Sequence, residues 1–530
     1  MGDKHKRNHH SISRRGLIGG IGLATSVSIA GCVGGEDEEN DETGDLEEGH
    51  LILTLATEPQ GLDPHDHEHT ETDIAARHSY EKILDRDPSG EIIGGIAEDW
   101  ERIEPGHVRF HLRDETITFH DGSELTAEDV AFSLNRIVDD DVDIASPQRT
   151  FISGVESAEV AEDGAAVDAF SPDLNPAVFD NIAAVGGQVV QREWIETNDR
   201  EVINTEANGT GPYEVVEYTE DVDIELTAYE DYWGEQPDAQ SLRITWTEEA
   251  SSRVSQLLNE ETDIAVNVPP EDVPRVEDSD VARIETVPSQ RAIFCPMDTT
   301  TEPFSSTEFR QAINYAFDQE GMIDDVLSGF GNPVSQPSLE GAVGYNPDTD
   351  PYPYDQDRAE ELVEESGHTD VDITLHTPVD RYLRDVEIGQ AMVNDIDSLS
   401  NVNCDLEQRD FGALVDEAFD GDPETAPDFW MIGWGNTAFH PTFIIEPYLT
   451  PEGITGQYVD DDEGNELFQE ARTEPDDETR EELFQELNQY YHDQAPWLFS
   501  HQQYSIYGMN NRVEWEARAD EVVPAQEMNL

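Results

Sequence analysis

Cysteine is scarce in this sequence of 530 residues, which contains only Cys32, Cys295 and Cys404. The last two lie far apart and outside any spacing at which cysteines ligate a metal, so a cysteine metal cluster and a framework of several disulfides are excluded. Two alternatives stay open for this pair: one disulfide, which export from the cell would allow, or two buried free thiols, the simpler interpretation. Either way, we expect the hydrophobic core to supply most of the stability.

Positive charge is scarce as well, because 29 lysine and arginine residues stand against 120 aspartate and glutamate residues, a net charge of -91. Lysine does not occur after Lys82. No basic face is available to meet phosphates, which argues against nucleic acid as a partner. The acidic residues are spread between regular hydrophobic segments, a distribution typical of surfaces adapted to high salt, where repulsion is screened. The composition therefore favours a halophilic archaeon as the source.

The apolar stretch at residues 16–30 is shorter than the roughly 20 residues that a membrane-spanning helix needs. Arg14 and Arg15 precede it in the sequence Ser-Arg-Arg-Gly-Leu-Ile, which resembles the twin-arginine (Tat) export signal. We therefore predict a Tat signal peptide over residues 1–31 and a protein that works outside the cytoplasm.

The end of the signal peptide and the first mature residue read Ile-Ala-Gly-Cys (29–32), which resembles a lipobox, where the cysteine is lipidated and becomes the new N-terminus. The alternative is an ordinary cleavage site followed by a coincidental cysteine. Residues 32–49 are predicted to be the lipidated Cys32 and an extended acidic tether, because like charges in a row repel. We thus expect a protein anchored to the outer face of the cell membrane by a lipid on Cys32.

Common enzyme signatures are missing from the predicted mature chain. It has no Gly-x-Ser-x-Gly nucleophile motif, no His-Glu-x-x-His zinc motif and no Gly-x-x-x-x-Gly-Lys-Ser/Thr phosphate loop. An exported hydrolase stays open as an alternative because any two of the many carboxylates could form a glycosidase pair. A surface-layer protein would be expected to show internal repeats, and none is found.

Strand and helix patterns alternate along the roughly 480 residues after the tether, which is typical of an α/β fold with two or three domains. Strand-like alternation of apolar residues begins at residues 50–55 and recurs at 108–112, 117–120 and 371–375. A helix is predicted after Thr126, which can form a capping box with Asp129. Further helices are predicted at residues 309–317, 322–327, 358–365, 386–399 and 479–492.

Six longer segments, in order along the predicted mature chain, carry a recognisable pattern. They are EPQGLDPHDHEH (58–69), TFHDGSELTAEDVAFSLNRI (118–137), GTGPYEVVEYTEDVDIELTAYEDYWG (209–234), FSSTEFRQAINYAFDQEGMIDDVLSGFGNPVSQP (304–337), IGWGNTAFHPT (432–442) and APWLFSHQQYSIYG (495–508). Together they strongly resemble family 5 of the solute-binding proteins of ABC transporters, the dipeptide and oligopeptide type.

The resemblance implies a bilobal α/β clamp of the periplasmic-binding-protein type II, with an extra subdomain in the first lobe. It places the core of the first lobe at residues 50–93, 205–285 and 495–530, the extra subdomain at 94–204 and the second lobe at 286–494. It implies capture of a peptide or related small solute outside the cell and delivery to the permease subunits of an ABC importer, whose separate ATPase subunits hydrolyse ATP. We expect a monomer, no enzymatic activity and no cofactor; a nickel-type metal-chelate binding protein of the same fold is the alternative.

The resemblance also places the ligand cleft between lobes joined by two crossing strands, with walls near residues 62–69, 377–384 and 433–440. In peptide-binding relatives an aspartate shortly after a Gly-Trp pair holds the ammonium group of the ligand, and an arginine can pair its carboxylate. Arg381 matches the arginine, whereas Thr437 stands where the aspartate is expected. A hydroxyl cannot compensate a buried ammonium, which argues against a simple dipeptide as ligand.

Each candidate ligand contact has a structural alternative. Arg381 could instead form a surface ion pair with Asp380 or Asp385. Trp434 is predicted to form a stacking wall, and its alternative is core packing.

Asn436, His440 and His65 complete the set of candidate ligand contacts. Asn436 and Thr437 could equally cap their loop, and His440 could simply end it before a proline. His65 alternates with two further histidines up to residue 69, a pattern that could bind zinc or nickel, but neutral imidazoles in a loop are the simpler interpretation and we assign no metal site.

Overall fold

The computed structural model describes residues 49–67, 69–139, 141–152, 154–379, 381–419 and 425–530, and all of them belong to one compact unit that spans residues 44–530. The predicted export signal with Arg14 and Arg15, the lipidation site Cys32 and the acidic tether lie outside the described residues. Within the described part of the chain, every helix is too short or too polar to cross a membrane.

The largest sheet has nine strands in the order β16-β12-β17-β11-β1-β10-β9-β8, with β13 added beside β17. Strand β1 runs parallel to both of its neighbours, and the other pairs are antiparallel. The strands are β1 (His50–Leu55), β8 (Tyr213–Thr219), β9 (Asp223–Ala228), β10 (Ser241–Trp246), β11 (Ile264–Ala265), β12 (Ala282–Pro296), β13 (Gly331–Pro333), β16 (Ile432–Gly435) and β17 (Trp497–Asn510). The apolar alternation at residues 50–55 does predict β1, whose Leu51, Leu53 and Leu55 are buried.

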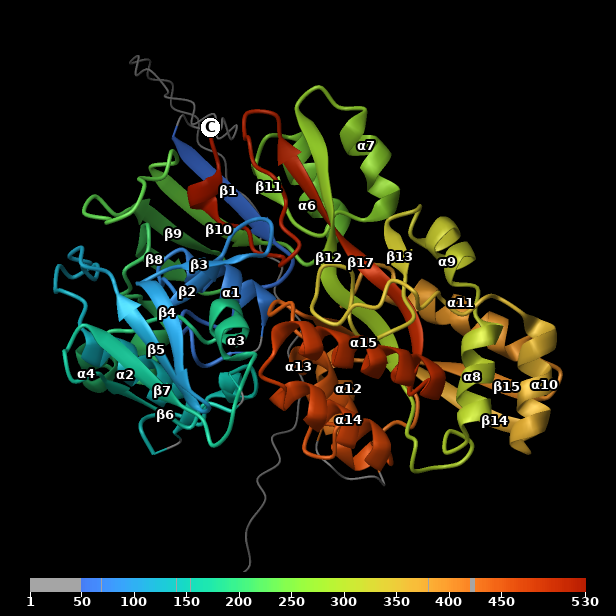
Figure 1. Cartoon of the computed structure of the whole chain (residues 1–530). Helices are drawn as coiled ribbons and strands as arrows, with labels where there is room; N and C mark the ends of the chain where they lie inside the picture. Colours follow the sequence, from blue (N-terminus) through green and yellow to red (C-terminus); the bar gives the residue numbers. More distant parts are fainter. Residues whose placement is uncertain (1–48, 68, 140, 153, 380, 420–424) are drawn as a thin grey trace, which may run out of the picture. The chain divides into compact units, whose positions relative to one another are not determined.

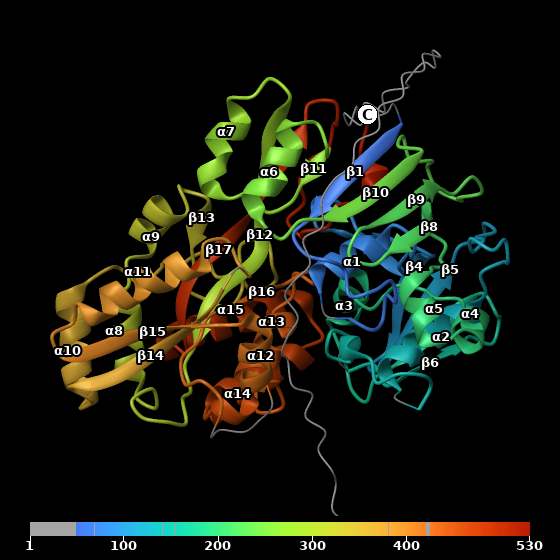
Figure 2. The same cartoon turned by 180° about the vertical axis from the view of Figure 1, so that it is seen from behind.

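Two long strands, β12 and β17, run through the centre of the molecule (Figures 1 and 2). They pair in antiparallel register from Ala282 opposite Asn510 to Pro296 opposite Trp497, and the register shifts between Pro288 and Ala292 and again between Ile293 and Phe294. Strand β17 pairs with β11 near one end and with β13 near its middle. These two strands therefore tie the elements around β1 to the helices that follow β12.

A separate four-stranded antiparallel sheet in the order β4-β5-β7-β6 packs against helix α2. The strand predicted at residues 108–112 is part of β5. Residues 117–120 form no strand, because the chain reverses in a tight turn: Thr118 makes a single β-bridge with Glu124, and the N–H of Phe119 donates to the carbonyl of Ser123. The elements of this region are β2 (Leu84–Arg86), β3 (Ile92–Gly94), β4 (Ala97–Glu104), β5 (His107–Leu112), α2 (Ala127–Val138), η1 (Pro147–Thr150), β6 (Ser157–Val160), β7 (Ala166–Phe170), α3 (Val178–Ala184), α4 (Arg192–Thr197) and α5 (Arg200–Thr205).

The part of the chain between β12 and β17 forms two groups of elements (Figure 1). One is a parallel pair, β14 and β15, packed with four helices; its elements are α8 (Thr307–Ala316), α9 (Gln319–Val326), α10 (Gln356–Ser366), β14 (Val371–Pro378), α11 (Asp385–Asp397) and β15 (Val402–Arg409). The other is mainly helical, with α12 (Phe411–Phe419), α13 (Thr442–Leu449), η3 (Gly456–Tyr458), α14 (Asp462–Thr473) and α15 (Asp477–Gln494). Elements that cover the β1 region are α1 (Thr70–Arg77), α6 (Ala250–Leu258), η2 (Pro270–Asp272), α7 (Val273–Glu277) and η4 (Ala525–Glu527).

Cys295 and Cys404 lie in the same hydrophobic core cluster, around β12 and β15, and both are buried free thiols. Burial raises the pKa of Cys404 to about 12 and that of Cys295 well above its usual value. Both thiols therefore stay protonated at neutral pH and act as apolar core residues.

Candidate functional site

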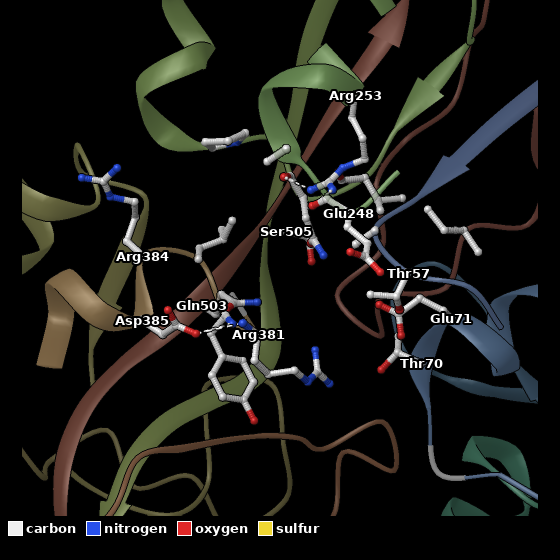
Figure 3. Close-up of a pocket in the computed structure, with 18 of the residues that line it drawn as sticks. Thr57, Thr70, Glu71, Glu248, Arg253, Arg381, Arg384, Asp385, Gln503 and Ser505 are labelled. Carbon is white, nitrogen blue, oxygen red and sulfur yellow. Dashed lines mark hydrogen bonds between the residues drawn. The ribbon is translucent and has the colours of Figure 1, made fainter. Parts of the chain in front are cut away.

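A cavity of about 680 Å³ lies beside β17, a volume within the range of roughly 300–1,000 Å³ that is typical of small-molecule sites. One wall is built by the end of β1, the first turns of α1 and α6, and η2; the other is the loop from β14 into α11 (Figure 3). Gln503, Ser505 and Tyr507 of β17 line the space between these walls.

The first turn of α1 brings Thr70 and Glu71 to the cavity. The helix begins after His69, whose backbone is extended and whose side chain makes no cap hydrogen bond. Glu71 is 7% exposed, an unusual degree of burial for a carboxylate that makes no hydrogen bond or ion pair with the residues that the structure describes.

An ion pair between β12 and the C-terminal segment forms part of the cavity lining. Arg291 Nη2 lies 2.5 Å from Glu521 Oε2, and both side chains are close to nine-tenths buried. The pairing raises the pKa of Arg291 in spite of desolvation. Because the carboxylate of Glu521 already balances it, Arg291 offers a ligand hydrogen bonds rather than an uncompensated charge.

The loop before α11 is organised by Asp385. Its Oδ2 accepts hydrogen bonds from the backbone N–H groups of Arg381 and Tyr382 at 2.9 and 3.1 Å. Tyr382 in turn donates from its hydroxyl to the carbonyl of Gly433. Arg384 adopts a positive φ of 58° directly before the helix, a conformation that costs about 1 kcal/mol or more for a residue with a side chain.

The guanidinium of Arg381 lies over two aromatic rings, those of Tyr382 and Phe411, at 5.1 Å from each centroid. Stacking of this kind holds a planar cation in place without neutralising it. Among the residues that the structure describes, no carboxylate forms an ion pair with this guanidinium, and Asp385 meets the backbone of Arg381. Arg381 thus presents an available positive charge to the cavity.

The remaining predicted ligand contacts do not line the cavity. Trp434 donates from Nε1 to the carbonyl of Phe443 and packs edge to face on Tyr448. Asn436 is 2% exposed and accepts the N–H of His440 through Oδ1, while Thr437 Oγ1 is buried without a hydrogen-bond partner.

His440 and His65 are also fully enclosed elsewhere. Burial lowers the pKa of His440 to about 3, and its Nδ1 lies 2.9 Å from the hydroxyl of Thr442. His65 donates from Nε2 to the carbonyl of Gln188, and burial lowers its pKa to about 3 as well. In the described part of the chain, no three side chains of the His, Cys, Asp or Glu type come together as a metal site would need.

The sequence did not point to Glu71, Gln503 or the Arg291–Glu521 pair. Glu71, Arg291 and Gln503 are each separated by more than 200 residues along the chain, and the fold brings them together at the cavity. The pairing of β12 with β17 places Arg291 near Gln503. A usable signal did exist in the adjacent amides Gln502 and Gln503, because a polar pair within a strand that is buried almost throughout marks a place where it meets polar partners or a ligand.

Known proteins are similar to this chain in sequence and in fold. A family model described as bacterial extracellular solute-binding proteins, family 5, matches residues 91–456. The dipeptide-binding protein of Escherichia coli strain K12 is 25% identical over 435 residues, which cover 77% of this chain and 80% of that protein.

Two solved structures extend the likeness to three dimensions. The ABC transporter-associated periplasmic binding protein DppA of Helicobacter pylori, in complex with the peptide STSA, has a TM-score of 0.79 at 19% identity and covers 91% of this chain and 98% of that one. NikZ of Campylobacter jejuni, in complex with Ni(L-His), has a TM-score of 0.78 at 18% identity, and the match covers 92% of this chain and 100% of that one. They confirm the predicted fold, a bilobal α/β clamp.

Proposed function

Because this chain belongs to the bacterial extracellular solute-binding proteins of family 5, we propose that it is the receptor of an ABC importer that captures peptides or a related small solute and delivers it to a membrane permease. The permease and the ATPase that drives it are separate subunits. The receptor binds its ligand without covalent chemistry.

One observation carries this proposal: the 680 Å³ cavity has walls from distant parts of the chain and contains Arg381, a cation with no carboxylate partner among the described residues. A guanidinium held against two rings suits a bidentate contact with a carboxylate. A solute with a carboxylate fits this wall of the cavity.

The mechanism follows from the position of the cavity beside β12 and β17. Two strands that connect the predicted lobes can bend as a hinge, and a ligand that touches both walls stabilises the closed form by its differential contacts. The permease then recognises the closed form.

The test is a ligand screen of the full chain in multimolar KCl by thermal shift, with calorimetry for every hit. Di- and oligopeptides, other anionic small molecules, sugars and metal chelates are compared, and metal chelates are included because a similar structure holds Ni(L-His). A ligand at 100-fold excess over its Kd stabilises the folded state by about 2.7 kcal/mol. If no class of solute raises the melting temperature, the receptor function is refuted.

Export and anchoring belong to the same proposal. We infer a Tat signal with Arg14 and Arg15, a lipid on Cys32 and a monomer at the outer face of the membrane, all from the sequence pattern. The variant Cys32→Ser should appear in the medium or stay unprocessed, as followed by fractionation and mass spectrometry. Unchanged membrane association of this variant would contradict the lipid anchor.

A further inference from the structure

The two walls of the cavity carry charges of opposite sign that have no ion-pair partner among the described residues. Glu248 on the first wall lacks a partner too, but it is exposed to solvent, whereas Glu71 is buried. Glu71 on α1 belongs to one wall and Arg381 to the other, and Figure 3 shows them on opposite sides of the cavity. Neither side chain forms an ion pair with another residue that the structure describes. Among the described residues, a buried carboxylate without a cationic partner thus lies across the cavity from an arginine without a carboxylate partner.

Two other arginines that line the cavity are already satisfied. Arg291 is paired with Glu521, and Arg253 directs its guanidinium at backbone carbonyls, among them those of Thr247 and Val266. Burial lowers the pKa of Arg253 to about 10, and the charge of Glu71 opposes that shift only in part; for Arg291 the main partner is Glu521 and Glu71 adds a smaller effect. Glu71 thus lies near both arginines without a hydrogen bond or ion pair to either. The carboxylate oxygens of Glu71 are therefore available to accept hydrogen bonds from a ligand in the cavity.

Gln503 lies on β17 between the two walls and lines the same cavity. Its Oε1 is enclosed by the protein and has no hydrogen-bond partner among the described residues, so this oxygen is not open to a ligand in the cavity. Glu71 is therefore the acceptor on which the assignment of the ammonium rests.

We propose that Glu71 is the residue that binds the ammonium group of the ligand, with Arg381 pairing the carboxylate. The ligand class is then a zwitterion with a primary ammonium at one end and a carboxylate at the other, such as a short peptide. This assignment rests on the proposed receptor function. An ammonium has three donors and needs an anionic partner when it leaves water, which Glu71 supplies from a part of the chain remote from Thr437.

The experiment is calorimetry with the full chain in 2 M KCl, on the wild type and the variants Glu71→Gln, Arg381→Gln and Glu364→Gln. The probes are Ala-Ala, Ala-Phe and Ala-Glu, each also as its N-acetyl and its C-terminal amide form. Glu364→Gln is the matched control, because it removes the same charge at an exposed position on α10 that does not line the cavity. Thermal unfolding of each variant checks that it is folded.

We expect wild-type affinity for the best free dipeptide to fall at least tenfold on N-acetylation. Glu71→Gln should lose at least tenfold in affinity for the free dipeptide and should no longer distinguish it from the acetylated form. Arg381→Gln should instead lose the distinction between the free acid and the amide, and Glu364→Gln should match the wild type. This crossed pattern separates ligand contact from a general loss of stability, which would weaken all probes alike.

Three outcomes overturn the assignment. A Glu71→Gln variant that still discriminates against N-acetylation shows that another acid holds the ammonium. A Glu71→Gln variant that is only less stable, with unchanged affinities, shows that Glu71 merely balances Arg253 and Arg291. Binding of sugars or metal chelates but of no dipeptide refutes the zwitterion while the receptor function stands, whereas no binding of any solute class refutes the receptor function itself.

Discussion

The cavity shows at the level of single residues what makes an arginine available to a ligand. Arg291 is held by a carboxylate and Arg253 by backbone carbonyls, so the hydrogen-bonding capacity of both is largely used within the protein. Within the part of the chain that the structure describes, Arg381 is held by its backbone and by two ring faces, which fix its position without neutralising its charge. Burial alone does not separate these roles; the chemistry of the immediate partners does.

Buried histidines make the stability of this protein sensitive to acid, and His501 is the simplest case. Burial lowers its pKa to about 3 in the folded protein, while the unfolded chain binds the proton near pH 6.5. Between these values the unfolded state binds more protons, so the contribution is complete above about pH 6.5 and is lost as the pH falls towards 3. One such group contributes a slope of about 1.4 kcal/mol per pH unit.

We predict that His501→Gln reduces the dependence of the unfolding free energy on pH by about 1.4 kcal/mol per pH unit between pH 4.5 and 6. Urea unfolding at constant KCl and several pH values measures it. Phe499→Leu is the control, because it changes packing two residues away on β17 without removing a titratable group, and its effect should be the same at every pH. An unchanged slope in His501→Gln would contradict the prediction.

At the level of elements, local signals placed the helices and strands well. Thr126 and Asp129 form the predicted capping box of α2, and α10 ends at Gly367, which has a φ of 79°. The helix predicted from residue 322 begins at Gln319 instead, because Asp318 caps it by accepting the N–H of Gly321. The ends of these helices are set by capping residues within four positions of each other, so they can be predicted from the local sequence.

The cavity could be predicted only in part, for a physical reason. The resemblance led to Arg381, which lies in a loop shaped by the nearby Asp385. Glu71 and Gln503 are defined by burial and by the absence of a partner, and both depend on packing between segments hundreds of residues apart. A composition with 120 acidic residues gives no means to single out one unpaired carboxylate in advance.

The capping box of α2 allows a test at this scale. Thr126 is exposed, its Oγ1 accepts the N–H of Asp129 at 3.3 Å, and Asp129 Oδ2 accepts the N–H of Thr126 at 3.0 Å. We expect Thr126→Ala to lower the free energy of unfolding by about 1 kcal/mol, and Thr126→Ser to retain most of it, because serine keeps the accepting oxygen. Urea titration followed by circular dichroism measures both. A serine variant as unstable as the alanine variant would show that the hydroxyl does not act as the cap.

The whole molecule carries its net charge of -91 on a surface almost without lysine. Lys82, the single lysine after residue 6, is 4% exposed and bonds to Asp85 and to the carbonyl of Ala183. Burial lowers the pKa of Lys82 to about 8. The single lysine among the described residues is thus buried and hydrogen-bonded, and their surface carries none, which fits a surface adapted to hydration in high salt.

A surface with so much negative charge predicts that the stability of the fold increases with salt concentration. The screening length falls from roughly 10 Å at 0.1 M to about 3 Å at 1 M salt, which removes most of the repulsion between surface carboxylates. We expect the melting temperature to rise by more than about 5 °C between 0.2 and 2 M KCl, equivalent to at least about 1–2 kcal/mol. Sucrose at equal osmolality is the control, because it favours compact states without screening charge. Equal stabilisation by sucrose would refute the electrostatic explanation.

An ion pair across the cavity provides a test of lobe closure. Arg384 Nη1, at the start of α11, lies 2.6 Å from Glu271 Oε1 on η2, and these two elements belong to the predicted second and first lobes. The side chains are 33% and 53% exposed, and pairs of this kind contribute about 0.2–1 kcal/mol. If the pair forms only when the lobes close on a ligand, its energy adds to ligand affinity rather than to the stability of either lobe.

We therefore predict that Glu271→Gln weakens ligand binding by up to about fivefold, the equivalent of about 1 kcal/mol, with the melting temperature of the ligand-free protein unchanged. The matched control is Asp272→Asn, the neighbouring acid on η2, whose partner Arg275 lies on the adjoining helix α7. Because salt screens an exposed pair, the effect of Glu271→Gln measured by calorimetry should shrink between 0.5 and 3 M KCl. Equal weakening by Asp272→Asn, or an effect that does not depend on salt, would mean that the contact between Arg384 and Glu271 does not report closure.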